Sequence, residues 1–195
     1  EVFKDTQQLI RYVMDSYNVC IFAYGQTGSR KTHTTMCGPS GGSTMDRGIN
    51  FLTQNDLFWI SFARKNIMNY MSNGGISLLD ATMHLVKSTN DVLNLMKLGE
   101  MNRFVSSTAL NNRSSRSHSV LTVHVQGKDI SGNIQRSCLH LVDLVGSERV
   151  DKSEVTGDRL KEAQYINGSL SCLGDVITAL AQKNSHIPYR NSKLT

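Results

Sequence analysis

A segment near the N-terminus has the composition of a phosphate-binding loop. Residues 25–32 read GQTGSRKT, one residue away from the pattern G-x-x-x-x-G-K-[ST]. In that pattern successive backbone N–H groups curl around phosphate oxygens. Lys31 would reach the β- and γ-phosphates, and the Thr32 hydroxyl would ligate Mg²⁺. Arg30 occupies the second glycine position, so an ordinary glycine turn is the alternative interpretation. The candidate nucleotide-binding residues are Gly25, Gln26, Thr27, Gly28, Ser29, Arg30, Lys31 and Thr32.

A second candidate segment begins with the sequence DLVG, which starts at Asp143 and ends at Gly146. It follows an expected strand, and an aspartate at the C-terminal end of a strand can hold Mg²⁺ through water. A glycine at the position of Gly146 can offer its N–H to a γ-phosphate. Because D-x-x-G is common, the alternative is a strand end followed by a turn. The nucleotide interpretation is favoured because the same chain also contains a candidate phosphate loop.

A third candidate segment, residues 111–118, reads NNRSSRSH and contains three serines and two arginines. A solvated loop or a phosphorylation target is one interpretation of such a run. In a nucleotide site, the hydroxyls of Ser114 and Ser115 would suit Mg²⁺ and its waters. Arg116 could then pair with an acidic residue such as Glu148.

Composition limits the class of protein. The chain has 195 residues, 39% of them hydrophobic, and a net charge of +5. This length suits one domain or part of a larger one, and the longest apolar run, residues 19–24, is too short to span a bilayer. The N-terminal residues lack the basic start and apolar stretch of a secretory signal, and the missing initiator Met favours a fragment or a processed product. The basic pI selects no partner, and nucleic-acid binding has no further support.

Hydrophobic periodicity predicts the elements that must position these segments. Residues 2–17 show the period of an amphipathic helix. Residues 19–24 form an unbroken apolar run, which predicts a strand buried on both faces. A tight loop and a helix beginning at Lys31 follow it, so the expected order is strand, phosphate loop, helix.

Only three strands are predicted in the chain, and the stretch 66–75 has no assignable pattern. Ser88 and Asp91 have the spacing of a capping box. The remaining expected elements are an exposed loop at 37–50, helices at 49–63 and 88–103, a polar loop at 111–118, a hairpin of strands at 119–126 and 134–144, and a helix carrying Leu170, Leu173, Ile177 and Leu180.

Four segments, GQTGSRKTHT, NNRSSRSH, LVDLVGSER and IPYRNSKLT, occur in this order. The set resembles the kinesin motor domain, and NxxSSRSH followed by LVDLxGSE is specific to kinesins among P-loop ATPases. The resemblance covers nearly the whole chain except 66–75, and the last segment is most similar to plant kinesins with a C-terminal motor. It implies an α/β P-loop NTPase fold with a central sheet flanked by helices. Strands are then missing before residue 1, between residues 63 and 83, and after Thr195.

The resemblance also implies roles for the candidate residues in a single partial motor domain spanning 1–195. Residues 25–32 would bind ATP, with 111–118 as switch I and 143–148 as switch II. The implied switch and catalytic residues are Ser114 and Ser115 near Mg²⁺ and the attacking water, Arg116 bridging to Glu148, Asp143 and Gly146 sensing the γ-phosphate, and Asn167 positioning water. The implied Mg²⁺ ligands are Thr32, Ser115 and Asp143.

The expected partner is the microtubule, which implies a cytoplasmic, cytoskeletal location without nucleic-acid or membrane binding. Segment 158–195 would face tubulin through Lys161, Arg190 and Lys193. Oligomerisation is expected through regions outside this chain.

Two functions remain open on these residues. One is an ATP-dependent microtubule motor domain. The other is a non-catalytic microtubule-binding remnant, favoured by Arg30 and by the missing strands, whereas the intact switch motifs favour the motor. Gly168, where kinesins usually have lysine, removes one tubulin-facing charge. A GTPase would require a guanine-reading Asn-Lys-x-Asp motif, and the sequence contains none.

Overall fold

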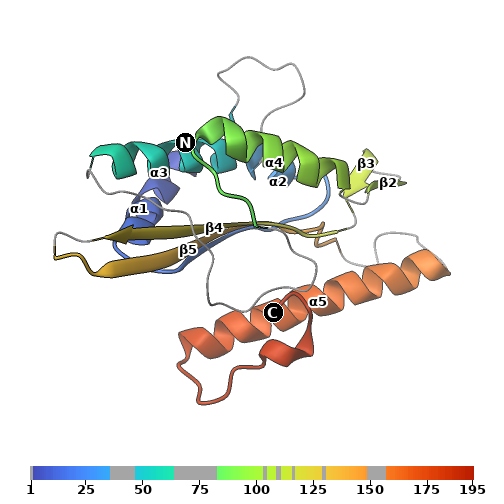
Figure 1. Cartoon of the computed structure of the whole chain (residues 1–195). Coiled ribbons are helices and arrows are strands. Elements are labelled where there is room, and N and C mark those ends of the chain that lie inside the picture. Colours follow the sequence, from blue (N-terminus) through green and yellow to red (C-terminus); the bar gives the residue numbers. More distant parts are fainter. Residues whose placement is uncertain are drawn as a thin grey trace.

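The computed structural model describes residues 2–35, 47–63, 83–102, 105–108, 111–115, 117–128, 131–148 and 157–195. Figure 1 shows the elements that these residues form. In chain order they are α1 (Val2–Met14), β1 (Val19–Ala23), α2 (Lys31–Thr35), α3 (Ile49–Ala63), α4 (Thr89–Asn102), β2 (Val105–Thr108), β3 (Asn111–Ser115), β4 (Ser119–Lys128), β5 (Ile134–Asp143), α5 (Asp158–Ala181) and the 3-10 helix η2 (Tyr189–Asn191).

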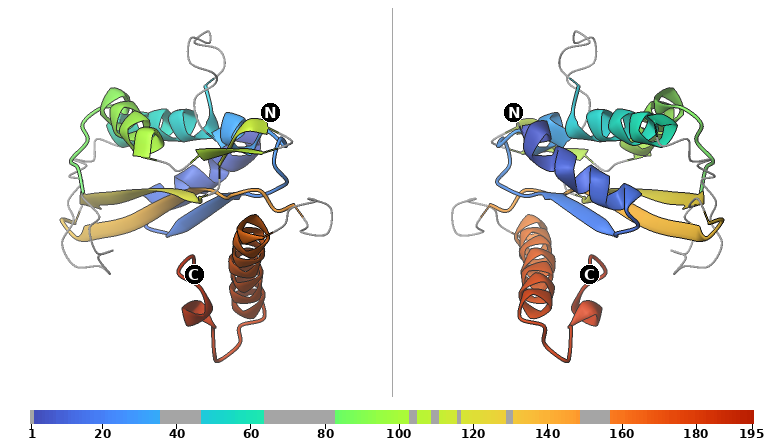
Figure 2. Two further views of the ribbon diagram at one scale, coloured as in Figure 1. Left: turned by 90° about the vertical axis from the view of Figure 1, so that its right-hand side faces the viewer. Right: turned by 90° about the vertical axis from the view of Figure 1, so that its left-hand side faces the viewer.

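The main sheet has the strand order β1-β5-β4. Strand β1 runs parallel to β5, with Ala23 opposite Asp143. Strands β4 and β5 pair in antiparallel register, which confirms the expected hairpin. Helices α1 and α3 lie on one side of this sheet and α5 lies on the other (Figures 1 and 2). The arrangement is a three-layer α/β structure.

The larger hydrophobic core lies between the sheet and helices α1 and α3. Side chains from the inner faces of β4 and β5 meet one face of α1, as its helical period predicts. The buried members are Ile10, Val13, Met14, Leu57, Val123, Val125, Leu139 and Leu141. A smaller cluster of Val142, Leu144 and Leu173 joins the other face of the sheet to α5.

Strand β1 is not buried on both faces, which corrects the expectation from its apolar run. Val19 and Ile21 pack against the larger core. Cys20 is exposed, and Phe22 keeps 37% of its surface exposed. Among the described residues, β1 is also an edge strand. The apolar run therefore predicted the strand correctly. It did not predict which face of the strand other elements cover, because those elements are distant in the sequence.

The expected loop at 111–118 contains a strand, which is a second correction. Residues 111–115 form β3, which pairs antiparallel with β2 as a separate two-stranded sheet. Such a pair satisfies its backbone hydrogen bonds whatever its side chains are. Neither strand has the apolar alternation on which strand prediction depends, so the pattern missed both.

The boundaries of helix α4 are set by the expected capping box. One oxygen of Asp91 accepts hydrogen bonds from the backbone N–H groups of Lys87 and Ser88, both at 2.9 Å. The Ser88 hydroxyl in turn accepts from the Asp91 N–H at 3.2 Å. These contacts satisfy donors that a helix N-terminus otherwise leaves unpaired.

The unassigned stretch 66–75 and most of the expected loop 37–50 lie outside the described residues. Helix α1 ends at Met14 rather than at residue 17. None of the described helices combines the length and the apolar character that crossing a bilayer requires.

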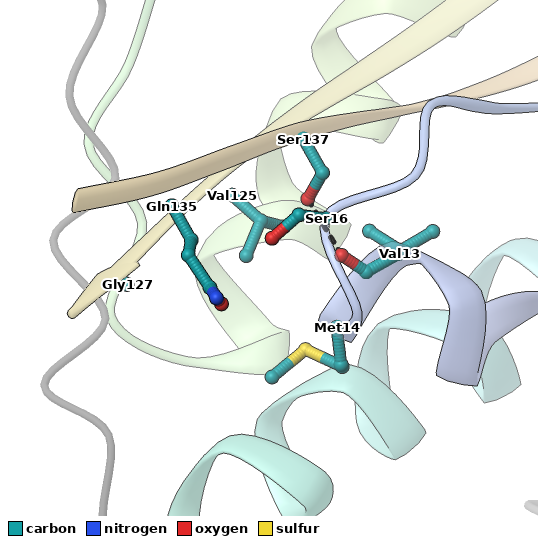
Figure 3. Close-up of a pocket in the computed structure, with 7 residues that line it drawn as sticks. All are labelled: Val13, Met14, Ser16, Val125, Gly127, Gln135 and Ser137. Atoms are coloured by element: carbon teal, nitrogen blue, oxygen red, sulfur yellow. Dashed lines mark hydrogen bonds between the residues drawn. The ribbon is translucent and has the colours of Figure 1, made fainter. Parts of the chain in front are cut away.

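A shallow pocket lies at the C-terminal end of α1, against the β4–β5 hairpin (Figure 3). The Ser137 hydroxyl donates a hydrogen bond of 2.7 Å to the carbonyl oxygen of Val13 across it. This carbonyl belongs to the last turn of α1, and it also accepts a 3.2 Å hydrogen bond from the Ser16 N–H. The Ser137 contact fixes α1 on the sheet, so we assign the pocket a structural role.

We expect Leu139→Ala to lower the free energy of unfolding by about 2–5 kcal/mol, because Leu139 is fully buried in the central strand. Urea denaturation followed by circular dichroism measures this loss. Leu98→Ala, at a position 52% exposed on α4, is the matched control and should change stability little. Equal losses in the two variants would contradict the assignment of the core.

Candidate nucleotide site and its connection to helix α5

The candidate phosphate loop connects the C-terminal end of β1 to the first residue of α2. Gly25 has φ 150°, and a Cβ added there would lie 2.8 Å from the Ser29 hydroxyl. Gly28 has φ 82°, a conformation that glycine adopts without steric cost. A glycine-dependent cradle of this kind fits a phosphate group, because its backbone N–H groups can approach the oxygens closely.

Arg30 occupies the left-handed region, with φ 61°. Glycine enters this region freely, whereas a side chain makes it cost about 1–2 kcal/mol. The backbone at this position is therefore the one that a glycine would favour, although the chain carries an arginine there. The Arg30 side chain is exposed.

Lys31 lies back across the loop that precedes it. Its ammonium group donates a hydrogen bond of 2.8 Å to the Gln26 carbonyl oxygen. A lysine in this position can neutralise phosphate charge after exchanging that carbonyl for a phosphate oxygen.

Thr32 and Asp143 meet, although 111 residues separate them in the sequence. The Thr32 hydroxyl donates a 2.7 Å hydrogen bond to a carboxylate oxygen of Asp143. Asp143 is buried, with 3% of its surface exposed. A hydroxyl and a carboxylate oxygen are ligands that suit Mg²⁺. Two of the three residues expected to hold the metal therefore lie together at the base of the loop.

Glu148 binds directly to the phosphate loop, a contact that the sequence did not predict. Its carboxylate accepts a 2.9 Å hydrogen bond from the Thr27 N–H and a 2.6 Å hydrogen bond from the Thr27 hydroxyl. Gly146 lies against both side chains, and a Cβ there would collide with them. An anionic carboxylate thus occupies donors of the candidate phosphate cradle.

The pKa of Glu148 reflects this contact. Burial alone would raise it, but the hydrogen bonds from Thr27 and the nearby charge of Lys31 outweigh burial. The net result is a pKa below the ordinary value of 4.5. The folded structure therefore favours the charged carboxylate.

Helix α5 contacts segment 143–148 from the other side. The Asn167 amide donates a 3.2 Å hydrogen bond to the Glu148 carbonyl oxygen. His118 makes a second connection, since it contacts the Val145 N–H and the Ser169 hydroxyl. In the sequence, His118 stands out only as the last residue of NNRSSRSH. That position does not predict contacts with Val145 or Ser169.

The structure leaves parts of the expected switch I undescribed. Arg116 lies outside the described residues, so its expected pairing with Glu148 stays a prediction. Ser114 and Ser115 lie in β3, opposite Ser106 and Val105. Their side chains are outside the description, and their expected roles near Mg²⁺ also stay predictions.

The residues expected to face tubulin lie on α5 and on the segment that follows it. Lys161, Arg190 and Lys193 are all exposed. The Thr195 hydroxyl donates 2.7 Å to the Tyr189 carbonyl oxygen, and Leu194 packs against the cluster containing Leu173. Figure 2 shows this segment beside α5, on the side of the sheet opposite α1 and α3.

Comparison with known proteins identifies the family. The kinesin motor domain model matches residues 1–71 and 63–195. The chain belongs to the kinesin motor domain family. It is 63% identical to the kinesin-like protein KIN-14L of Arabidopsis thaliana and 62% identical to KIN-14A of Oryza sativa subsp. japonica. Each alignment covers all of this chain and 23% of the relative, so the chain spans about a quarter of their length.

Solved structures support the same family and fold. A KIF14 structure with ADP in complex with a microtubule matches with a TM-score of 0.78 and 31% identity, covering 96% of this chain and 63% of that one. A KIF14 dimer with AMP-PNP in complex with a microtubule matches with a TM-score of 0.78 and 29% identity, covering 99% and 64%. The expected kinesin resemblance, plant relatives and α/β fold with an incomplete sheet are confirmed.

The alignments also show that this kinesin chain is internally short. The alignment to KIN-14L extends over 224 positions, whereas the chain has 195 residues, so at least 29 positions lie opposite gaps in this chain. The two stretches matched by the family model overlap at 63–71. This junction begins at the last residue of α3 and precedes α4, in the region where the kinesin resemblance implies missing strands.

We expect Arg30→Gly to bind ATP more tightly than the unsubstituted chain. Glycine removes both the side chain and the cost of a left-handed arginine. Arg30→Ala separates the two causes, because it removes the guanidinium and keeps the Cβ, and it should recover less affinity. Titration with a fluorescent ATP analogue measures the three dissociation constants. Equal affinities for the arginine and glycine forms would refute this account of Arg30.

We also expect the stability of the chain to fall in acid partly through Glu148. Because its folded-state pKa is lowered, its contribution is fully present above pH 4.5 and is lost as the pH falls through that lower value. Urea denaturation between about pH 6 and pH 3 should give a shallower decline for Glu148→Gln, whose amide does not titrate in this range. Asp175→Asn, at an exposed position of α5, is the control and should follow the unsubstituted chain. If the Glu148→Gln variant loses stability in acid as steeply as the unsubstituted chain, the lowered pKa assigned to Glu148 is contradicted.

Proposed function

We propose that this chain serves as an ATP-dependent microtubule motor domain. The single observation that carries the proposal is the position of segment 143–148. It is hydrogen-bonded to the candidate phosphate loop through Thr32 and Thr27, and to α5 through Asn167. A segment held on both sides can pass a change at the loop to the helix.

The proposed nucleotide is ATP, held by residues 25–32 with Mg²⁺ near Thr32, Asp143 and Ser115. Mg²⁺-ATP supplies the phosphoryl group for hydrolysis and the negative charge to which the switch segments respond. Lys31 would contribute positive charge to the cradle, and the Gly146 N–H would donate to a terminal phosphate. The fit rests on the glycine-dependent cradle and on the oxygen ligands of Thr32 and Asp143.

Glu148 and a bound phosphate would compete for the Thr27 N–H, since both are anions that accept from it. Nucleotide entry would therefore release Glu148 from the loop. The freed carboxylate would pair with Arg116 as Ser114 and Ser115 close over the site. Opening and closing of this pairing is the proposed local switch.

The proposed partner surface consists of α5 and the segment ending at Thr195. The exposed cations Lys161, Arg190 and Lys193 would attract an acidic protein surface. The KIF14 structures are described as complexes with a microtubule. We therefore propose tubulin as the partner and the cytoskeleton as the location, with oligomerisation through regions outside this chain.

A second candidate function is a microtubule-binding remnant that does not hydrolyse ATP. The left-handed Arg30 and the alignment positions, at least 29 in number, that lie opposite gaps in this chain favour it. The two functions share the microtubule surface and differ in turnover.

Microtubule-stimulated ATPase measurements separate the two functions. The motor proposal predicts turnover that rises with microtubule concentration and is lost in Lys31→Ala, with the exposed Lys87→Ala as the matched control. Co-sedimentation with microtubules should weaken in Arg190→Glu/Lys193→Glu and stay unchanged in Lys97→Glu on α4. Co-sedimentation without stimulated turnover would favour the remnant, and neither binding nor turnover would refute both.

A further inference from the structure

His118 lies where three functional segments meet. It follows the NNRSSRS stretch and immediately precedes β4. Its Nδ1 accepts a 3.2 Å hydrogen bond from the backbone N–H of Val145, within segment 143–148. Its Nε2 lies 3.3 Å from the Ser169 hydroxyl, on the middle turns of α5. One imidazole therefore contacts the two segments that the proposed function must couple.

The hydrogen-bond network requires one form of the ring. The Val145 N–H can only donate, so Nδ1 must carry no proton. The Ser169 hydroxyl donates to the Ile166 carbonyl oxygen at 2.7 Å, which leaves its oxygen to accept from Nε2–H. The ring is thus neutral with its proton on Nε2. Hydrogen bonds therefore run without interruption from the Val145 N–H through the His118 ring to Ser169 of α5.

We propose that His118 is a positioning residue that couples the nucleotide-dependent position of segment 143–148 to the position of α5. This inference rests on the proposed function and adds to it a second residue, beside Asn167, through which the coupling acts. Val145 lies between Asp143 and Glu148, the two carboxylates bonded to the phosphate loop. Displacement of this segment therefore breaks the Val145 bond or moves the imidazole, and Ser169 follows with it.

The other connections between the same elements differ from this one in position or in kind. Asn167 binds the Glu148 carbonyl, at the far end of the segment from Asp143. Leu144 and Leu173 meet through apolar contact, which is non-directional and tolerates sliding. The His118 contacts are directional, since hydrogen bonds weaken steeply away from linear geometry. His118 is also the last residue of the candidate switch I segment, so these contacts connect that segment to the other two.

The test measures the ratio of microtubule dissociation constants in ADP and in AMP-PNP for the whole chain. His118→Phe keeps the ring shape and removes both hydrogen bonds, and we expect it to bring the ratio about fivefold closer to one. Ser169→Ala removes only the α5 partner and should act in the same direction. Because both belong to one hydrogen-bond chain, adding Ser169→Ala to His118→Phe should have no further effect.

Two further readouts separate coupling from a general loss of structure. His118→Asn keeps an acceptor near the Nδ1 position and should retain part of the ratio. In the unsubstituted chain, the ¹⁵N spectrum of the His118 ring should show the neutral Nε2–H form. Matched controls are the exposed His84→Phe and Ser131→Ala, which should leave the ratio unchanged.

Each outcome has one meaning. If the unsubstituted chain binds no nucleotide, or its ratio is already one, the proposed function fails and the inference fails with it. If the chain shows a ratio different from one and His118→Phe or Ser169→Ala preserves it, the inference alone is overturned. Additive losses in the double variant, or a ring protonated on Nδ1, would also overturn it.

Discussion

Parallel pairing of β1 with β5 determines where the candidate site residues lie. In a parallel pair the carboxyl ends of both strands reach the same edge of the sheet, so the segments that follow them become neighbours. The Leu144 N–H donates to the Ala23 carbonyl at 3.2 Å, and the Ser147 N–H donates to the Gly25 carbonyl at 3.0 Å. Side-chain contacts 111 and 121 residues apart in sequence then form on this backbone frame.

The features that the sequence predicted correctly have local causes. The helix 49–63 follows from its periodicity, the start of α4 from the Ser88–Asp91 capping box, and the β4–β5 hairpin from alternation around a glycine-containing turn. The position of Asp143 at a strand end and of Lys31 at a helix start also follows from local order. Such features are specified within a few residues, and a pattern can therefore reveal them.

The features that the sequence did not predict depend on partners distant in the chain. Polar strands β2 and β3 exist because they pair with each other. Cys20 is exposed, although Val19 and Ile21 on either side of it pack against the larger core. The bonds from Glu148 to Thr27 and from His118 to Ser169 require the tertiary fold, so no motif within either segment indicates them.

The candidate site of this kinesin chain lies at the end of two strands of the described sheet. Among the described strands, β1 and β5 lead directly into the loop and segment 143–148, and α5 packs on the end of β5. Strands β1 and β4 end the described sheet, with Phe22 and Val120 partly exposed along these edges. A shortened domain can therefore keep its site geometry while losing stability, because these properties depend on different strands.

The most direct test of this account is a crystal structure of the chain with AMP-PNP and Mg²⁺. The account predicts phosphate density inside the 25–32 loop, metal density beside Thr32 and Asp143, and a Glu148 carboxylate that no longer contacts Thr27. A loop without phosphate density, with Glu148 still bonded to Thr27 at saturating nucleotide, would contradict it.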